Sequence, residues 1–307
     1  MASAAKKLAR KSAVKGARKL MLQHLEQAES GVERLPHRDD AEALHDLRVA
    51  LRHVRTYLTT YRKLFAKAVP AKSFDALREL AHLTNPARDA EVEVSWIAGH
   101  SRARRATSGA AHLRAQLTRR HTQLLREIRE RFAQDFPPLA SRLRQQLERA
   151  EDTHRRTFGQ STAKQVRRQG RRLRKRLDRI QGPTDVENCH QARIAAKRVR
   201  YLLEPFSELR GAPKLIDHLK ELQDTLGEMH DLHVLLKTMA EAPERARASR
   251  SRVPRSELAS LAATARRQLP RLYAQVEQRW FGRAGAKLDR ALGRMASTVR
   301  EKGHPNK

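Results

Sequence analysis

A segment with helical spacing near the N-terminus returns later in the chain, and this repeat limits the possible folds more than any other feature. Residues 45–55 read HDLRVALRHVR, and residues 190–200 read HQARIAAKRVR, 145 positions further on. A second pair follows at an offset of 142, where Leu77–Val92 shares its Leu, Glu-Leu, Asp and Val positions with Leu219–Val234. Two ordered matches at nearly one offset indicate an internally duplicated module.

Each copy is expected to be helical, so the predicted fold class is all-α. Good helix formers dominate, Gly and Pro separate periodic segments, and no alternating stretch predicts a strand. Copy one covers about 17–158 and copy two about 159–303. The expected helices are 17–35, 41–68, 73–84, 86–99, 106–135, 137–157, 162–181, 186–210, 213–226, 228–241, 256–281 and 283–301. The breaks at Asn85-Pro86 and at Gly227 fall at matching places.

The N-terminus is predicted to be a separate basic arm. Residues 1–19 contain seven Lys or Arg and no acid, with small residues between them. Such a charge run is typical of a solvated, partly disordered segment, here residues 1–16.

Charge identifies the kind of partner. The 307 residues include 65 Lys+Arg against 34 Asp+Glu, a net charge of +31, which implies attraction to polyanions. One Cys excludes a disulfide framework and zinc-finger spacing. No apolar run is long enough to span a membrane, and the N-terminus lacks the apolar core of a signal peptide. Aromatic residues are only 4%, a poor supply of stacking platforms for single-stranded nucleic acid.

The repeated segments each carry a stripe of cations. At 100° per residue, His45, Arg48, Arg52 and Arg55 fall within about 80° of one helix face, beside the apolar stripe. His190, Arg193, Lys197 and Arg200 repeat these angles. Like charges three and four residues apart repel, so such a face needs water or a polyanion to cover it. A solvated face is the simpler interpretation of one stripe, and the repetition favours a binding site.

Other constellations are weaker. Residues 164–179 add nine cations against one acid, and Lys164, Arg168, Arg171, Arg172 and Lys175 are a possible additional basic lining. Asp89 and Asp231 match between copies and are expected to hold Arg side chains or to favour a helix N-terminus. His230 and His233 lack a third ligand with clear spacing. We therefore expect no catalytic residue, metal site or cofactor, and no enzyme activity.

On these motifs the chain resembles the CHAD family, the conserved histidine α-helical domain, over roughly residues 17–303. His45 to Arg55, His190 to Tyr201, and the segments at Pro86–Asp89 and Leu226–Asp231 support the resemblance, and Arg198 lies within it. It implies two antiparallel bundles related by pseudo-twofold symmetry around a central basic pore or groove. The implied ligand is inorganic polyphosphate, bound by the signature His and basic residues.

The sequence therefore predicts a stand-alone polyphosphate-binding protein, cytoplasmic and associated with polyphosphate granules. The polymer offers charge and no base edges, so it needs many Arg and Lys donors and little else. The two histidines are expected to gain protons when a polyanion binds. A non-specific nucleic-acid-binding or nucleoid-associated protein remains the alternative, with the arm and a basic loop at 242–256 as its working parts.

Overall fold

The computed structural model describes residues 3–37, 40, 42–100, 109–152, 154–248 and 255–304. Helices account for nearly all of them, as the sequence predicts, and the described ranges contain no strand beyond one isolated bridge between Ser12 and Thr157. The helices are α1 (Ala4–Arg10), α2 (Ala13–Arg34), α3 (Ala43–Thr60), α4 (Arg62–Phe65), α5 (Ala71–Leu83), α6 (Asn85–His100), α7 (Gly109–Glu148), α8 (Phe158–Leu177), α9 (Val186–Leu203), α10 (Ala212–Ala248), α11 (Arg255–Trp280) and α12 (Gly282–Lys302), with a short 3₁₀ turn at Glu204–Phe206.

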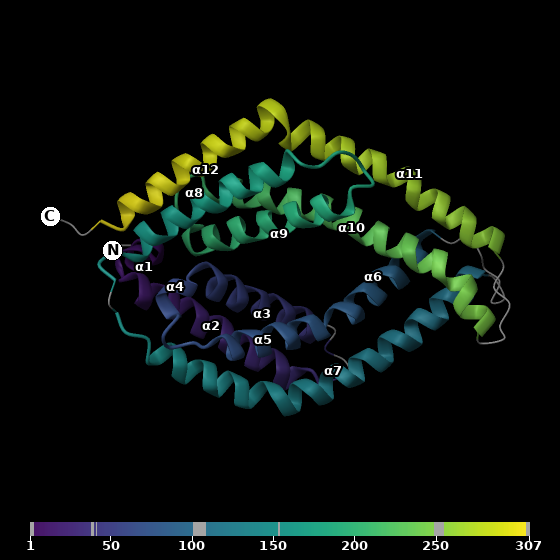
Figure 1. Ribbon diagram of the computed structural model, residues 1–307, viewed down its shortest axis with the longest axis horizontal. Coiled ribbons are helices and arrows are strands. Elements are labelled where there is room, and N and C mark those ends of the chain that lie inside the picture. Colours follow the sequence, from purple (N-terminus) through teal and green to yellow (C-terminus); the bar gives the residue numbers. More distant parts are fainter. Residues whose placement is uncertain are drawn as a thin grey trace.

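The helices form two halves that face each other along the long axis (Figure 1). In the first half α2 packs on α3 and α7, and α6 packs on α7; in the second, α8 packs on α9 and α12, and α10 packs on α11. Helix α7 covers one outer edge, and α11 and α12 cover the other (Figure 1). The order of packed pairs is thus alike in both halves, while the duplication itself stays an interpretation of the sequence.

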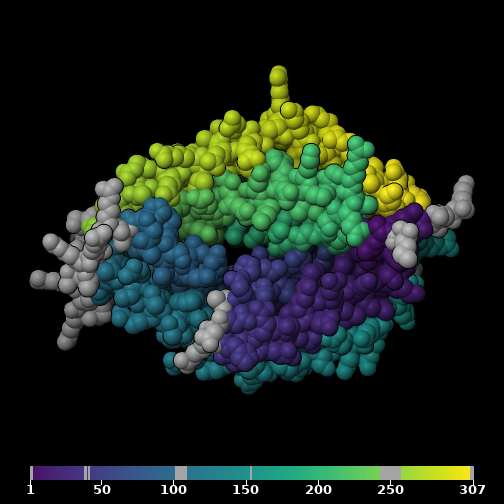
Figure 2. Space-filling model, turned by 180° about the vertical axis from the view of Figure 1, so that it is seen from behind, coloured from purple at the N-terminus to yellow at the C-terminus, as the bar shows by residue number. Residues whose placement is uncertain are grey.

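The halves meet at both ends of the molecule. At one end Tyr57 donates a hydrogen bond from its hydroxyl to the backbone oxygen of Tyr201 at 2.8 Å, and the hydroxyls of Tyr61 and Thr162 lie 2.6 Å apart. At the other end a second apolar cluster joins α6 and α7 to α10 and α11, and includes Ile97 and Leu235. Seen from behind, the boundary between the halves crosses the whole face (Figure 2).

The two repeated segments fold as predicted, on α3 and α9. The apolar stripe expected for the first is buried at Leu47, Leu51, Val54 and Leu58, and in the second Val199 is fully buried. Asp185 caps α9 by accepting a hydrogen bond from the backbone N–H of Asn188 at 3.2 Å. Burial of the apolar stripes fixes the rotation of both helices and therefore the direction of their cations.

Several predicted boundaries are wrong. Gly227 does not break the chain, because α10 runs through it without interruption. Pro137 and Pro138 lie inside α7, where a break between two helices is expected. The segment 41–68 divides into α3 and α4 at Tyr61. Of the expected loop 242–256, residues 242–248 and 255–256 are helical and the remainder lies outside the described residues.

The predicted N-terminal arm is also wrong for residues 4–16. Ser3 and Ser12 cap α1 and α2, and α1 packs against α8 and α12 of the other half. Ala5, Leu8 and Ala9 of α1 are buried in the main core. Their i, i+3, i+4 spacing makes one apolar face, which outweighs the surrounding Lys and Arg because those side chains still reach water.

A glycine substitution separates a packed N-terminus from a solvated arm. A Cβ at Gly16 would lie 2.4 Å from Cγ of Phe158, whereas a Cβ at Gly293 in α12 would meet nothing within 4 Å. Gly→Ala in an open helix stabilises by roughly 0.5–1 kcal/mol, but overpacking a core costs about 1–3 kcal/mol. We therefore expect Gly16→Ala to lower the free energy of unfolding in denaturant titrations and Gly293→Ala to raise it. A stabilising effect of both substitutions would contradict the packed N-terminus.

Candidate polyanion site between the halves

Helices α3 and α9 bring cations from both halves into one group, the central cluster, which consists of Arg48, Arg52, Arg193 and Lys197. Arg52 donates a hydrogen bond to the hydroxyl of Tyr201 at 3.3 Å, which ties α3 directly to α9. Burial, together with the charges of all three arginines, lowers the pKa of Lys197. Each of the four side chains is partly buried. The repeated motifs therefore converge on one place between the halves.

The cluster has no neutralising partner at contact distance. None of its four side chains lies within 4 Å of a carboxylate belonging to the described residues. The Nε of Arg193 is buried, and no described group accepts its hydrogen bond. Uncompensated buried charge is costly, so the free cluster is a destabilising feature that an anion would relieve.

Burial and mutual repulsion shift the titration of these groups. Burial, followed by the charges of Arg193, Arg52, Arg200 and Arg48, lowers the pKa of Lys197 from 10.5 to about 6. Burial and the charge of Arg52 lower the pKa of Arg48 to about 10, so this guanidinium stays charged at neutral pH. The pKa of Arg193 is lowered by burial, while the charge of Asp231 opposes the change. Lys197 is thus the member that loses its charge near neutral pH.

Neighbouring residues orient the arginines. Arg48 donates to the backbone oxygen of Thr84, to its hydroxyl at 2.6 Å and to Asn85 Oδ1 at 3.5 Å, where α5 meets α6. Gly227 lies against Arg193, whose Nε would be 3.4 Å from a Cβ at that position. The absence of a side chain there leaves room for the guanidinium inside a continuous helix.

Asp89 and Asp231 lie near the cluster and support it electrostatically. The charge of Asp89 favours the charged form of Arg48, and that of Asp231 favours the charged form of Arg193. Burial raises the pKa of both carboxyl groups. Their predicted part in holding arginines thus has electrostatic support. Asp231 lies in the interior of α10, so the alternative reading as a first-turn residue is wrong for it.

The remaining residues of the two stripes occupy different surroundings. His190 is partly buried beside His230, with ring centroids 5.1 Å apart, and burial and Arg193 lower its pKa. His45 is exposed. Arg200 is held by an ion pair to Glu204 at 2.8 Å and a hydrogen bond to Gln223 at 3.1 Å. Arg200 therefore adds positive charge near the cluster, but its guanidinium is already bonded to Glu204 and Gln223.

A lateral group lies beside the cluster and consists of Arg55, Arg78, Arg172 and Arg198. Burial, followed by the charges of Arg78, Arg52 and Arg198, lowers the pKa of Arg55. Burial, followed by the charge of Arg172, lowers the pKa of Arg198. Among the shifts resolved for described groups, Arg172 is the only one of the five predicted α8 cations whose charge acts on a predicted binding residue, Arg198. Lys164, Arg168, Arg171 and Lys175 are exposed along α8. Of the predicted additional lining, only Arg172 therefore acts on another predicted binding residue.

Other candidate chemistry finds little support in the geometry. Burial raises the pKa of the Cys189 thiol to about 11, which keeps it protonated and a poor nucleophile. Within the described ranges, no three His, Cys, Asp or Glu side chains gather as a metal site requires. No helix in these ranges is long and apolar enough to cross a bilayer.

The fold is all-helical, with basic helices of the two halves facing each other, and comparisons with known proteins give its family. Residues 17–240 match the CHAD domain, so the chain belongs to the CHAD domain family. The crystal structure of the CHAD domain from the plant Ricinus communis is similar, with a TM-score of 0.72 and 20% identity over 97% of this chain and 94% of that one. PptA from Streptomyces chartreusis is similar with a TM-score of 0.57 and 16% identity, over 95% and 99%. No curated protein matches.

The titration of Lys197 predicts how stability depends on pH. Between pH 6 and 10.5 the unfolded chain carries a proton on this amine that the folded chain lacks, so folding is favoured increasingly as pH rises. Lys197→Met removes this dependence. We expect the variant to be more stable than the parent near pH 6–7, with the difference shrinking toward pH 10 in denaturant titrations. The exposed Lys175→Met is the control and should show no such trend. A difference independent of pH would contradict a depressed pKa.

Proposed function

We propose that this chain binds inorganic polyphosphate between its two halves, in a basic pore or groove at the central cluster. The observation that carries the proposal is that the three arginines and the lysine of the central cluster come together from both halves without a carboxylate partner within 4 Å among the described residues. A phosphate chain supplies closely spaced negative charges and acceptor oxygens, which satisfy such donors pair by pair. Membership of the CHAD family supports the same ligand.

We further propose that the protein is a binding protein and not an enzyme. The central cluster supplies donors and charge, whereas the carboxylates near it, Asp89 and Asp231, favour the charged forms of arginines. Cys189 does not supply a nucleophile, because its thiol stays protonated. In the cell such a protein would reside in the cytoplasm and associate with polyphosphate granules.

Replacing two members of the cluster should weaken polyphosphate binding. A charge-assisted hydrogen bond is worth about 1.5–3 kcal/mol, so Arg52→Gln/Lys197→Gln should lower the affinity by about 100-fold or more. The matched control is Arg142→Gln/Arg149→Gln, two exposed arginines, one in α7 and one directly after it. The measurement is fluorescence anisotropy with labelled long polyphosphate at fixed pH and salt. Because we propose a binding protein and not an enzyme, the polymer should keep its original length after incubation.

Thermal unfolding of both variants shows whether the fold persists. A folded Arg52→Gln/Lys197→Gln protein that binds as tightly as the control would place the site elsewhere. Shortened polymer after incubation would refute the assignment as a binding protein.

Competition with duplex DNA separates polyphosphate from nucleic acid as ligand. The central cluster consists of donors only, and its members lie on helices packed within the molecule, not on a helix projecting into a groove. We expect polyphosphate to displace labelled polymer far better than DNA at equal phosphate concentration. Both affinities fall with salt through counterion release, so one salt concentration must be used throughout. Equal displacement, phosphate for phosphate, would favour the nucleic-acid alternative.

A further inference from the structure

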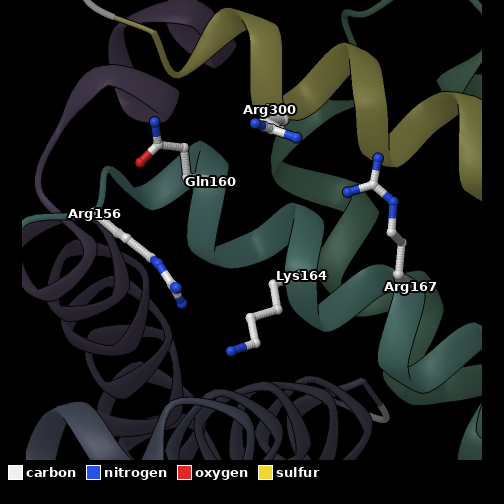
Figure 3. A pocket seen from close by; sticks show the side chains of 5 residues that line it. All are labelled: Arg156, Gln160, Lys164, Arg167 and Arg300. Atoms are coloured by element: carbon white, nitrogen blue, oxygen red, sulfur yellow. The ribbon is translucent and has the colours of Figure 1, made fainter.

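A cavity of about 350 Å³ lies where the start of α8 meets the end of α12. It is lined by Arg156, Gln160, Lys164, Arg167 and Arg300. Figure 3 shows Arg156 and Lys164 extending to one side of α8, and Arg167 extending toward α12, which carries Arg300. Four of the five are cations. None of the four lies within 4 Å of a carboxylate in the described part of the chain. We call this space the terminal pocket.

The uncharged member of the lining also presents a donor. Gln160 accepts a hydrogen bond from the backbone N–H of Thr157 through Oε1 at 3.2 Å, and the hydroxyl of Thr157 accepts from the backbone N–H of Gln160 at 3.3 Å. This capping box occupies the amide oxygen and leaves the amide nitrogen as the free end of the side chain. Every lining side chain therefore offers N–H donors, a set suited to a ligand made of acceptors.

The walls of the terminal pocket are held by close backbone packing. A Cβ at Gly159 would lie 2.7 Å from the backbone oxygen of Val299, so α8 and α12 approach closely there. Arg156 is fixed by its backbone oxygen, which accepts from Ala13 at 3.0 Å. The side chain of Arg167 donates to Ser297 at 2.9 Å. Cations from two helices are thus kept together in spite of their repulsion.

The terminal pocket is separate from the central cluster. The two share no residue, and the charges that shift the pKa values of Lys197, Arg48 and Arg193 do not include those of the pocket. Its volume is near the lower end for small-molecule sites and equals that of about ten waters. It can hold a few linked phosphate groups, and no aromatic side chain lines it to stack on a base.

We propose that the terminal pocket is a second anion site, which binds a pyrophosphate or triphosphate group. Two or three linked phosphates carry about as much negative charge as the four cations carry positive charge, whereas one phosphate, with about two negative charges, compensates only half of it. Such a group can be a free short anion or the end of a long polyphosphate chain. The second source rests on the proposed function, and the first does not.

Tripolyphosphate tests the terminal pocket directly. Arg156 and Arg300 are exposed, so Arg156→Ala/Arg300→Ala should fold normally. The matched control is Arg142→Ala/Arg149→Ala, at two exposed arginines in and directly after α7. By calorimetry we expect the pocket variant to lose about 100-fold in tripolyphosphate affinity at this site, about tenfold for each guanidinium removed. The control should change by less than about threefold. Equal affinity in the pocket variant and the control would overturn the proposal.

The Arg52→Gln/Lys197→Gln variant keeps the two proposals distinguishable. If it loses long polyphosphate but retains tripolyphosphate, both proposals stand. If tripolyphosphate depends on the central cluster and not on Arg156 and Arg300, the terminal pocket is refuted while the proposed function survives. If the Arg52→Gln/Lys197→Gln variant binds long polyphosphate as tightly as the parent, the proposed function fails. The terminal pocket is then judged only by the tripolyphosphate titration of the Arg156→Ala/Arg300→Ala variant.

Capped polymer identifies the source of the linked phosphates. Long polyphosphate whose terminal phosphates are blocked as phosphoramidates lacks the doubly charged ends. If the pocket holds chain ends, capping weakens binding to the parent protein and has no further effect on the pocket variant. If capping has no effect on the parent while tripolyphosphate still needs Arg156 and Arg300, the ligand is a free short anion.

Discussion

The mutual repulsion of cations between α3 and α9 is the constraint that the rest of the structure must overcome. Lys197 loses its charge near pH 6 because burial and four neighbouring arginines disfavour the ammonium form. Attractive contacts lie at the two ends of the molecule, where Tyr57 bonds to Tyr201 and where Ile97 packs with Leu235. Each fully buried large apolar side chain contributes roughly 1.5–3 kcal/mol, so a few of them balance the electrostatic cost between the ends.

Helix α1 also helps to hold the two halves together against this repulsion. Helix α1 leaves its own half and packs on α8 and α12, and the backbone N–H of Phe158 donates to Lys11 at 2.7 Å. The first and last helices of the chain are therefore packed together beside the terminal pocket. The same contacts that hold the halves in place also position Arg156 and Arg300.

The sequence predicts those parts of the fold that local periodicity determines. The apolar stripes of α3 and α9 are buried as predicted, because a 3.6-residue period determines which helix face meets the core. The helix breaks predicted at Gly227 and next to Pro137 are wrong, because a helix packed along its length tolerates residues that would end an isolated helix. The carbonyls freed by Pro137 and Pro138 belong to exposed residues 133 and 134, so this part of the helix faces solvent. The terminal pocket has no signal in the sequence, since Arg156 and Arg300 are far apart and belong to no motif.

The positions of Asp89 and Asp231 explain how a basic site remains available to a ligand. Both carboxylates favour the charged forms of cluster arginines, yet neither lies within 4 Å of them among the described contacts. At contact distance each would form a bidentate pair and occupy the N–H groups that a phosphate requires. At longer range each lowers the cost of the buried charge and leaves donors such as the Nε of Arg193 without a protein acceptor. The site therefore gives up stability in the free protein to keep its donors open, and a polyanion that binds only the folded state restores that stability in proportion to its affinity.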